Sequence, residues 1–230
     1  MTNFEREQML AQFQKQFPSS LEPLFVWAPG RVNLLGEHTD YNQGFVFPMA
    51  IDVGISMVGA LNGSDQVNLY SLDFKASASF SLDQISRCNS QTWTNYIRGV
   101  FQQFQVRGYK PKGVDLILQG NVPQGAGLSS SAALEVATAV LLIQLHNWNV
   151  DPVELVKLAQ DAENKFVGVA SGIMDQFASM MGEKDHALCL DCRSLDYKLI
   201  ALPFTEQGYA LAVVNSAVKR GLVDSEYNTR

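Results

Sequence analysis

One stretch of the chain limits its possible folds more than any other, because it sets a strand, a glycine-rich turn and a long helix in direct succession. Residues 114–118 are apolar and β-prone, residues 120–127 contain three glycines and a proline, and residues 130–146 repeat apolar side chains at helical spacing. Glycines allow backbone N–H groups to approach an anion, and the unsatisfied N–H groups at a helix start attract negative charge. The run Pro123–Ala133, with three serine hydroxyls at its helical end, therefore predicts a phosphate-binding loop.

Two better-known phosphate loops do not fit this run. A Walker A loop ends in Gly-Lys-Ser/Thr, and the chain contains no Gly-Lys pair. A dinucleotide-binding fingerprint needs a third glycine where Ser130 stands. Taken alone, the run is also compatible with an ordinary turn before a serine-capped helix.

A second polar cluster lies between residues 30 and 44, a segment bounded by glycines. Glu37, His38 and Asp40 crowd its centre, and Arg31 stands at its start. Carboxylates accept directional hydrogen bonds from the hydroxyl groups of a sugar, and an arginine can face a phosphoryl group. The cluster thus predicts sugar contacts, although a solvated surface turn would have a similar composition.

Two acidic residues further along the chain are candidates for the chemistry. Glu163 borders the apolar stripe of a helix that we expect to begin at Asp151, with Pro152 at its first position. Asp175 falls in the first turn of a helix expected over residues 171–181, where the helix dipole favours negative charge. We expect Glu163 to bind Mg²⁺ and Asp175 to act at a substrate hydroxyl. Either residue by itself could equally be an incidental surface acid.

The remaining elements predict an α+β fold. We expect helices over residues 1–17 and 92–107, a strand over residues 24–27 followed by a loop from residue 28, and β-rich segments over residues 45–60, 67–80 and 187–216. These elements are mixed along the chain and do not alternate regularly.

Charge and cysteine content exclude several classes of protein. The chain has 17 Lys and Arg against 23 Asp and Glu, so a nucleic-acid partner, which needs a basic face, is not expected. The longest apolar runs are too short to cross a bilayer, and the N-terminus lacks the apolar core of a signal peptide. Three cysteines, with Cys189 and Cys192 in a strand-like run, predict free thiols in a cytoplasmic protein.

In their order along the chain, these segments resemble the galactokinases, a family within the GHMP kinase superfamily. Residues 30–44 are similar to the galactokinase signature, and residues 123–133 to the second, ATP-binding motif of the superfamily; residues 172–176 and 225–228 are similar to two further galactokinase segments. The resemblance implies the α+β fold of a GHMP kinase N-terminal domain (ribosomal protein S5 domain 2-like) over residues 1–185. It also implies that residues 186–230 begin a ferredoxin-like C-terminal domain.

The resemblance further implies an activity and a role for each matching residue. The activity is transfer of the γ-phosphoryl group of ATP to the C1 hydroxyl of α-D-galactose, by a monomer that needs Mg²⁺ and has no membrane partner. Asp175 would be the base, or the anion that orients the C1 hydroxyl, and Arg31 would stabilise the transferring phosphoryl group. The other implied positions are Glu37, His38, Thr39, Asp40, Gly172 and Tyr227 at the sugar, Gly125, Ala126, Gly127, Leu128, Ser129, Ser130 and Ser131 at the ATP phosphates, and Ser131 and Glu163 at Mg²⁺.

Other interpretations remain open at this point. Galactokinases are longer than this chain and carry a third glycine-rich motif, so we expect an N-terminal fragment with weak activity or none by itself. A non-catalytic galactose sensor is disfavoured by the intact serine run 129–133, whereas a kinase for N-acetylgalactosamine or arabinose is compatible with the motifs. A phosphate-binding structural module would leave residues 37–40 unexplained. The kinase interpretation requires Arg31, Ser131, Glu163 and Asp175 to converge in space.

Overall fold

The structure, a computed structural model, describes residues 3–18, 21–123, 125–204 and 206–214. In chain order, its elements are α1 (Asn3–Gln16), β1 (Leu24–Asn33), a 3₁₀ turn (Asp40–Asn42), β2 (Phe45–Val46), β3 (Pro48–Leu61), β4 (Gln66–Ser71), β5 (Ala76–Ser81), α2 (Thr94–Val106), β6 (Val114–Gly120), α3 (Ser130–His146), α4 (Pro152–Asp161), a π-helical segment (Ala162–Val167), α5 (Met174–Met181), β7 (His186–Asp191) and β8 (Tyr197–Ala201).

The strands form one mixed sheet of eight strands around β3. Strand β3 pairs antiparallel with β1 along most of its length and with β6 and β7 on its other side. Strand β6 pairs parallel with β4, which continues into β5, whereas β7 pairs antiparallel with β2 and β8. Because parallel and antiparallel pairs share one sheet with unevenly spaced helices, the predicted α+β class is confirmed.

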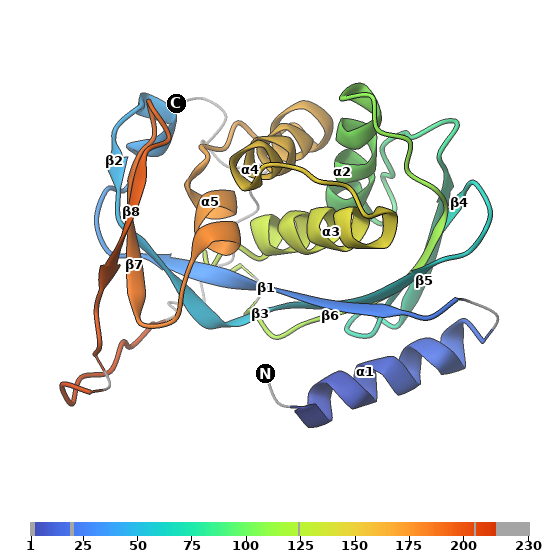
Figure 1. The fold of residues 1–230 in the computed structure, drawn as a ribbon, viewed down its shortest axis with the longest axis horizontal. Coiled ribbons are helices and arrows are strands. Elements are labelled where there is room, and N and C mark those ends of the chain that lie inside the picture. Colours follow the sequence, from blue (N-terminus) through green and yellow to red (C-terminus); the bar gives the residue numbers. More distant parts are fainter. Residues whose placement is uncertain (1–2, 19–20, 124, 205, 215–230) are drawn as a thin grey trace.

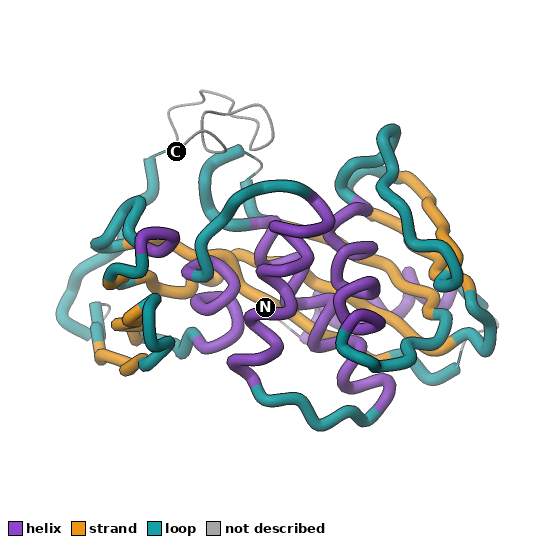
Figure 2. The backbone as a smooth tube through the Cα atoms, turned by 90° about the horizontal axis from the view of Figure 1, so that it is seen from above, coloured by secondary structure: helices purple, strands orange, loops and turns teal. Residues whose placement is uncertain are grey.

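Helices cover the two faces of the sheet unequally. Helices α2, α3, α4 and α5 lie on one face and α1 on the other (Figure 1), and Figure 2 looks onto the face with the larger helical layer. Successive side chains of β3 point to opposite faces of the sheet, so this strand contacts both helical layers. Met57 packs against the large layer, while Val58 faces Met9 and Phe13 of α1. All four side chains are buried.

Helix α3 lies at the centre of the large helical layer. Its bounds agree with the prediction, and it is buried around most of its circumference between the sheet and the neighbouring helices. Small side chains such as Ala133 and Ala137 allow this close approach. The N-terminus of α3, which follows the glycine-rich turn, is thereby held in a fixed place.

Three local predictions need correction. Strand β1 continues to Asn33, because residues 31–33 pair with residues 48–50 of β3 beyond a bulge, so Arg31 comes from a strand and not from the predicted loop. Helix α5 starts at Met174 and not at residue 171. Glu163 lies in the π-helical segment that continues α4, not in α4 itself.

The end of the sheet bears on the predicted division of the chain. Strands β7 and β8 pair with the strands before them, so residues 186–201 belong to the same sheet. The domain boundary after residue 185 stays a prediction. The segment 225–228, including Tyr227, lies outside the described residues. In the part of the chain that the structure describes, no helix has the length and apolar character needed to span a bilayer.

Candidate active site

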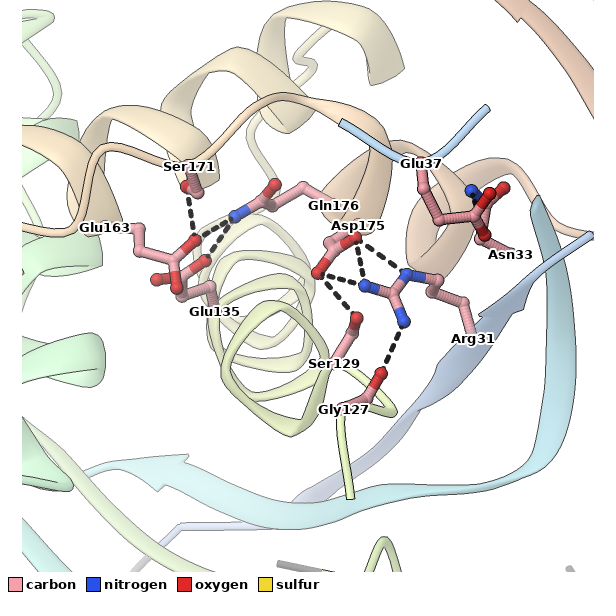
Figure 3. A network of polar contacts seen from close by, with 10 residues as sticks. All are labelled: Arg31, Asn33, Glu37, Gly127, Ser129, Glu135, Glu163, Ser171, Asp175 and Gln176. Atoms are coloured by element: carbon pink, nitrogen blue, oxygen red, sulfur yellow. Dashed lines mark hydrogen bonds and ion pairs between the residues drawn. The ribbon is translucent and has the colours of Figure 1, made fainter. Parts of the chain in front are cut away.

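Asp175 lies at the centre of a polar cluster that joins strand β1, the glycine-rich turn and helix α5 (Figure 3). Arg31 donates from Nε to Oδ1 of Asp175 at 2.7 Å and from Nη2 to Oδ2 at 2.8 Å. The hydroxyl of Ser129 donates to Oδ2 at 2.6 Å. The third nitrogen of the Arg31 guanidinium donates to the carbonyl of Gly127 at 2.7 Å. Two-point pairing and short charge-assisted bonds hold both charged groups in one orientation.

The backbone of β1 explains why Arg31 reaches the turn. The N–H of Arg31 donates to the carbonyl of Leu128 at 3.2 Å, which ties the strand directly to the phosphate loop. A Cβ at Gly30 would lie 2.5 Å from that same carbonyl, so only glycine allows the two backbones to come this close. The bulge beside it turns the Arg31 side chain towards the loop.

The glycine-rich turn has the backbone geometry of an anion-binding loop. Gly125 and Gly127 both have φ of 70°, and nothing lies within 4 Å of the position that a Cβ would take at either residue. Ser129, immediately before α3, has φ of 60°. An open, left-handed turn at a helix N-terminus leaves backbone N–H groups available to a phosphate. This geometry is compatible with the ATP loop, which stays a prediction, and the hydroxyl of Ser129 is directed to Asp175.

Glu163 is buried, so it is not the incidental surface acid that the sequence had left open as an alternative. Only 3% of it is exposed, and its Oε2 accepts from the hydroxyl of Ser171 at 2.6 Å and from Nε2 of Gln176 at 2.9 Å. The hydroxyl of Ser131 lies near this carboxyl and acts to lower its pKa. Burial raises the pKa of Glu163, and the nearby charge of Asp175 adds to the increase.

The donors at Glu163 fit a magnesium ion that arrives with a nucleotide. Among the described residues, no group of three or more His, Cys, Asp or Glu side chains could hold a metal. Mg²⁺ is usually held by one or two carboxylates together with substrate phosphates and water, so Glu163 and the adjoining hydroxyl of Ser131 form a suitable partial set.

The loop of residues 36–44 is braced from within. The hydroxyl of Thr39 lies 2.8 Å from the carbonyl of Gly36 and 2.7 Å from that of Phe45, so Thr39 closes the loop. His38 has φ of 61°, and its Nδ1 lies 2.6 Å from the hydroxyl of Tyr41. Glu37 is exposed and accepts from the side chain of Asn33 at 3.1 Å. Glu37 and His38 are exposed, and the hydroxyl of Thr39 braces the loop.

Asp40 connects this loop to helix α5. Its carboxyl is buried near the backbone N–H of Met174, and a Cβ at Gly172 would overlap it. Burial raises the pKa of Asp40, with a smaller contribution from the charge of Asp175. Beside Asp40 and Gly172 lies a pocket of about 400 Å³. The contact explains why glycine is needed at residue 172.

The structure brings together the four side chains on which the kinase interpretation depends. Arg31 bonds to Asp175, and Gln176, the residue after Asp175, bonds to Glu163 at 2.9 Å. The hydroxyl of Ser131 lies near the same carboxyl of Glu163. Sequence reasoning missed the buried Glu135 and Gln176, which are bonded to each other at 2.9 Å. A charged residue within the apolar helix α3 was the available signal for Glu135.

Comparisons with known proteins agree with this geometry. Residues 95–183 match the family described as the GHMP kinases N terminal domain, and residues 11–61 match the galactokinase galactose-binding signature. The chain is 44% identical to a galactokinase of Clostridium acetobutylicum over 95% of its own length and 56% of the relative's. It is 46% identical to a galactokinase of Bacillus subtilis over 98% and 58%, respectively, so it spans little more than half of these curated relatives.

Solved structures show the same fold. A structure of Lactococcus lactis galactokinase complexed with galactose superposes with a TM-score of 0.83 at 39% identity, covering 86% of this chain and 52% of that one. Methanococcus jannaschii mevalonate kinase, at 22% identity and a TM-score of 0.66 over 80% of this chain and 58% of its own, shares the fold. The predicted GHMP kinase N-terminal fold is therefore confirmed. Matched both by the GHMP kinases N terminal domain and by the galactokinase galactose-binding signature, the chain belongs to the galactokinase family of the GHMP kinases.

Proposed function

We propose that this chain carries the site at which the γ-phosphoryl group of ATP is transferred to the C1 hydroxyl of α-D-galactose, giving galactose 1-phosphate and ADP. The observation that carries the proposal is the cluster around Asp175. Arg31 and Ser129 donate hydrogen bonds to its carboxylate, and Arg31 also donates to the carbonyl of Gly127, so the acid lies directly beside the glycine-rich loop. Support for the sugar comes from the relatives named galactokinase and from the solved relative complexed with galactose.

The geometry supports a mechanism based on positioning and electrostatics. The oxygen of the C1 hydroxyl attacks the γ-phosphorus, the bond from that phosphorus to the β-phosphate oxygen breaks, and the hydroxyl proton passes to Asp175. Arg31 fixes the carboxylate of Asp175 and places positive charge beside the loop that would hold the phosphates. Phosphoryl transfer needs little covalent work from the protein, so these arrangements account for most of what the site must do.

The remaining components follow from their positions. Residues 125–131 would hold the ATP phosphates, and Ser131 with Glu163 would hold Mg²⁺, which when bound supplies positive charge to the phosphates. Glu37, His38, Asp40 and Gly172 would contact the sugar. A cytoplasmic location, the monomeric state and a place at the entry to galactose breakdown stay predictions; the three cysteines, all free, are compatible with a reducing compartment.

A coupled ATP assay on the purified full-length protein tests the proposal, because the fragment by itself is expected to have weak activity or none. We expect Asp175→Ala to lower kcat by more than about 10³-fold while nucleotide binding is retained, because removal of a base or orienting anion acts on the chemical step. Asp65→Ala, at an exposed carboxylate on the turn before β4, is the matched control and should leave kcat unchanged.

Three outcomes would contradict the proposal. Near-normal turnover by Asp175→Ala would remove that residue from the mechanism. Galactose, N-acetylgalactosamine and arabinose should be compared in the same assay, since a higher kcat/KM for either of the other sugars would replace galactose as the substrate. Galactose and ATP binding without turnover of any sugar would favour the sensor.

A further inference from the structure

A buried amide links two carboxyl groups beneath the candidate active site. Nε2 of Gln176 donates to Oε2 of Glu163 at 2.9 Å and to Oε2 of Glu135 at 2.9 Å (Figure 3). Glu135 and Gln176 are fully buried, and Glu163 is 3% exposed. The three side chains come from helix α3, helix α5 and the π-helical segment, so the amide also ties together three separate elements.

The orientation of the Gln176 amide follows from its surroundings. An amide nitrogen carries two hydrogens, and both are used by the two carboxyl groups. The side-chain oxygen of Gln176 has no hydrogen-bond partner where it lies, so if the amide were turned over, both of its hydrogens would be left without a partner, which is costly in a buried site. The pair of carboxyl groups therefore holds the amide in one orientation, and Glu135 supplies the half of that restraint that lies away from the nucleotide.

The presence of an acid at residue 135 is not explained by stability. Apart from Thr138, the other buried residues of helix α3 are apolar, and the structure shows no hydrogen-bond partner for Oε1 of Glu135 or for the side-chain oxygen of Gln176. Burial of a carboxyl costs free energy that a single hydrogen bond does not fully offset. An apolar side chain of similar volume would be expected to pack there as well or better. The acid is thus better explained by its effect on its neighbours.

We propose that Glu135 and Gln176 are positioning residues for the metal ligand Glu163. Glu135 fixes the amide of Gln176, and the amide together with the hydroxyl of Ser171 holds Oε2 of Glu163, so the carboxyl of Glu163 is kept in one orientation. The inference rests on the proposed function for the role of Glu163 as a ligand of Mg²⁺. Second-layer contacts of this kind commonly change metal affinity by about 10- to 100-fold.

The test compares nucleotide binding with and without the metal, in the absence of sugar. Calorimetry would give the dissociation constants of Mg²⁺·ADP and of ADP in EDTA for each variant. Glu135→Leu should weaken the binding of Mg²⁺·ADP by about 10-fold or more while metal-free ADP binds as before. Glu135→Gln keeps an acceptor for Gln176 and should bind Mg²⁺·ADP nearly as the unsubstituted protein does. Gln176→Leu should behave as Glu135→Leu does.

A matched control lies on the same helix. Thr138 is buried in α3 and bonds only to the carbonyl of Leu134, so Thr138→Val changes a buried polar group outside the network and should leave both constants unchanged. Thermal unfolding would confirm that Glu135→Leu is folded, as expected where a buried acid becomes apolar.

The possible results separate this inference from the proposed function. Equal weakening of metal-bound and metal-free nucleotide would show a merely structural role and overturn the inference, as would unchanged binding in Glu135→Leu. A loss confined to Mg²⁺·ADP, rescued in Glu135→Gln, supports the inference whether or not galactose is phosphorylated. If that loss appears while the unsubstituted protein fails to phosphorylate galactose, only the proposed function fails.

Discussion

Ser129 illustrates how a single side chain can have a different partner from the one its position suggests. It stands in a run of three serines that was expected to contact ATP phosphates, yet its hydroxyl donates to Asp175 at 2.6 Å. Its φ of 60° turns the side chain away from a normal helix start, and no hydrogen bond from it caps α3. The hydroxyl therefore contributes one of three hydrogen bonds that hold the acid.

Replacement of this serine separates the two roles. We expect Ser129→Ala to lower kcat by about 10- to 100-fold with little change in KM for ATP, because a hydrogen bond to a charged group contributes about 1.5–3 kcal/mol. Steady-state kinetics at saturating galactose would measure both parameters. A raised KM for ATP with normal kcat would instead place the hydroxyl at the nucleotide phosphates.

At the scale of elements, two helices of the large layer begin in different ways. Helix α4 is capped locally, because the side chain of Asp151 accepts from the N–H groups of Val153 and Glu154 at 2.9 and 3.2 Å. Helix α5 has no such local cap, and the carboxyl of Asp40, which comes from the distant loop of residues 36–44, lies near the N–H of Met174 at its start. The first device is readable from adjacent residues, whereas the second exists only after folding.

The local cap yields a stability prediction. Asp151→Ala should reduce the free energy of unfolding by about 0.5–2 kcal/mol, the usual range for loss of an N-cap, whereas Asp151→Asn should keep most of it. Urea unfolding followed by circular dichroism would measure the difference. Equal losses in the two variants would show that negative charge near the helix dipole, and not the capping hydrogen bond, stabilises α4.

At the scale of the whole molecule, the large helical layer encloses ionisable groups within an apolar core. Burial raises the pKa of Glu135 well above its ordinary value, and the charge of Glu163 adds to the increase. The folded state therefore binds a proton at Glu135 that the unfolded chain releases near its ordinary pKa of about 4.5. The stability linked to this group is fully present below that pKa and is lost as pH rises towards the folded value.

The raised pKa of Glu135 predicts how the free energy of unfolding changes between pH 5 and pH 8. Glu135→Gln cannot ionise, so its free energy of unfolding should fall less between pH 5 and pH 8 than that of the unsubstituted protein. Urea titrations of both proteins at the two pH values would measure this. Identical pH dependence in the two proteins would mean that the folded state does not retain the proton at Glu135.

Much of the fold could be predicted from local patterns. The bounds of α3 followed from its apolar repeat, and the start of α4 from Asp151 and Pro152. Less local features were missed: β1 extends to Asn33 because β3 offers it a partner, and α5 starts late because residues before Met174 take part in the site. Both depend on contacts between residues far apart in the sequence, which periodicity does not report.

The amino-acid sequence by itself determined the glycine turn, the helix that follows it, the acidic and basic candidates and, through their order, the family. Glycine spacing and apolar repeats act through the backbone within a few residues, so they are visible in one dimension. Only the tertiary structure decided that Ser129 faces Asp175, that Glu163 is buried, and that the amide of Gln176 joins it to Glu135. Burial and hydrogen bonding between distant residues arise from packing of the helices against the sheet, and they convert a set of candidates into one site.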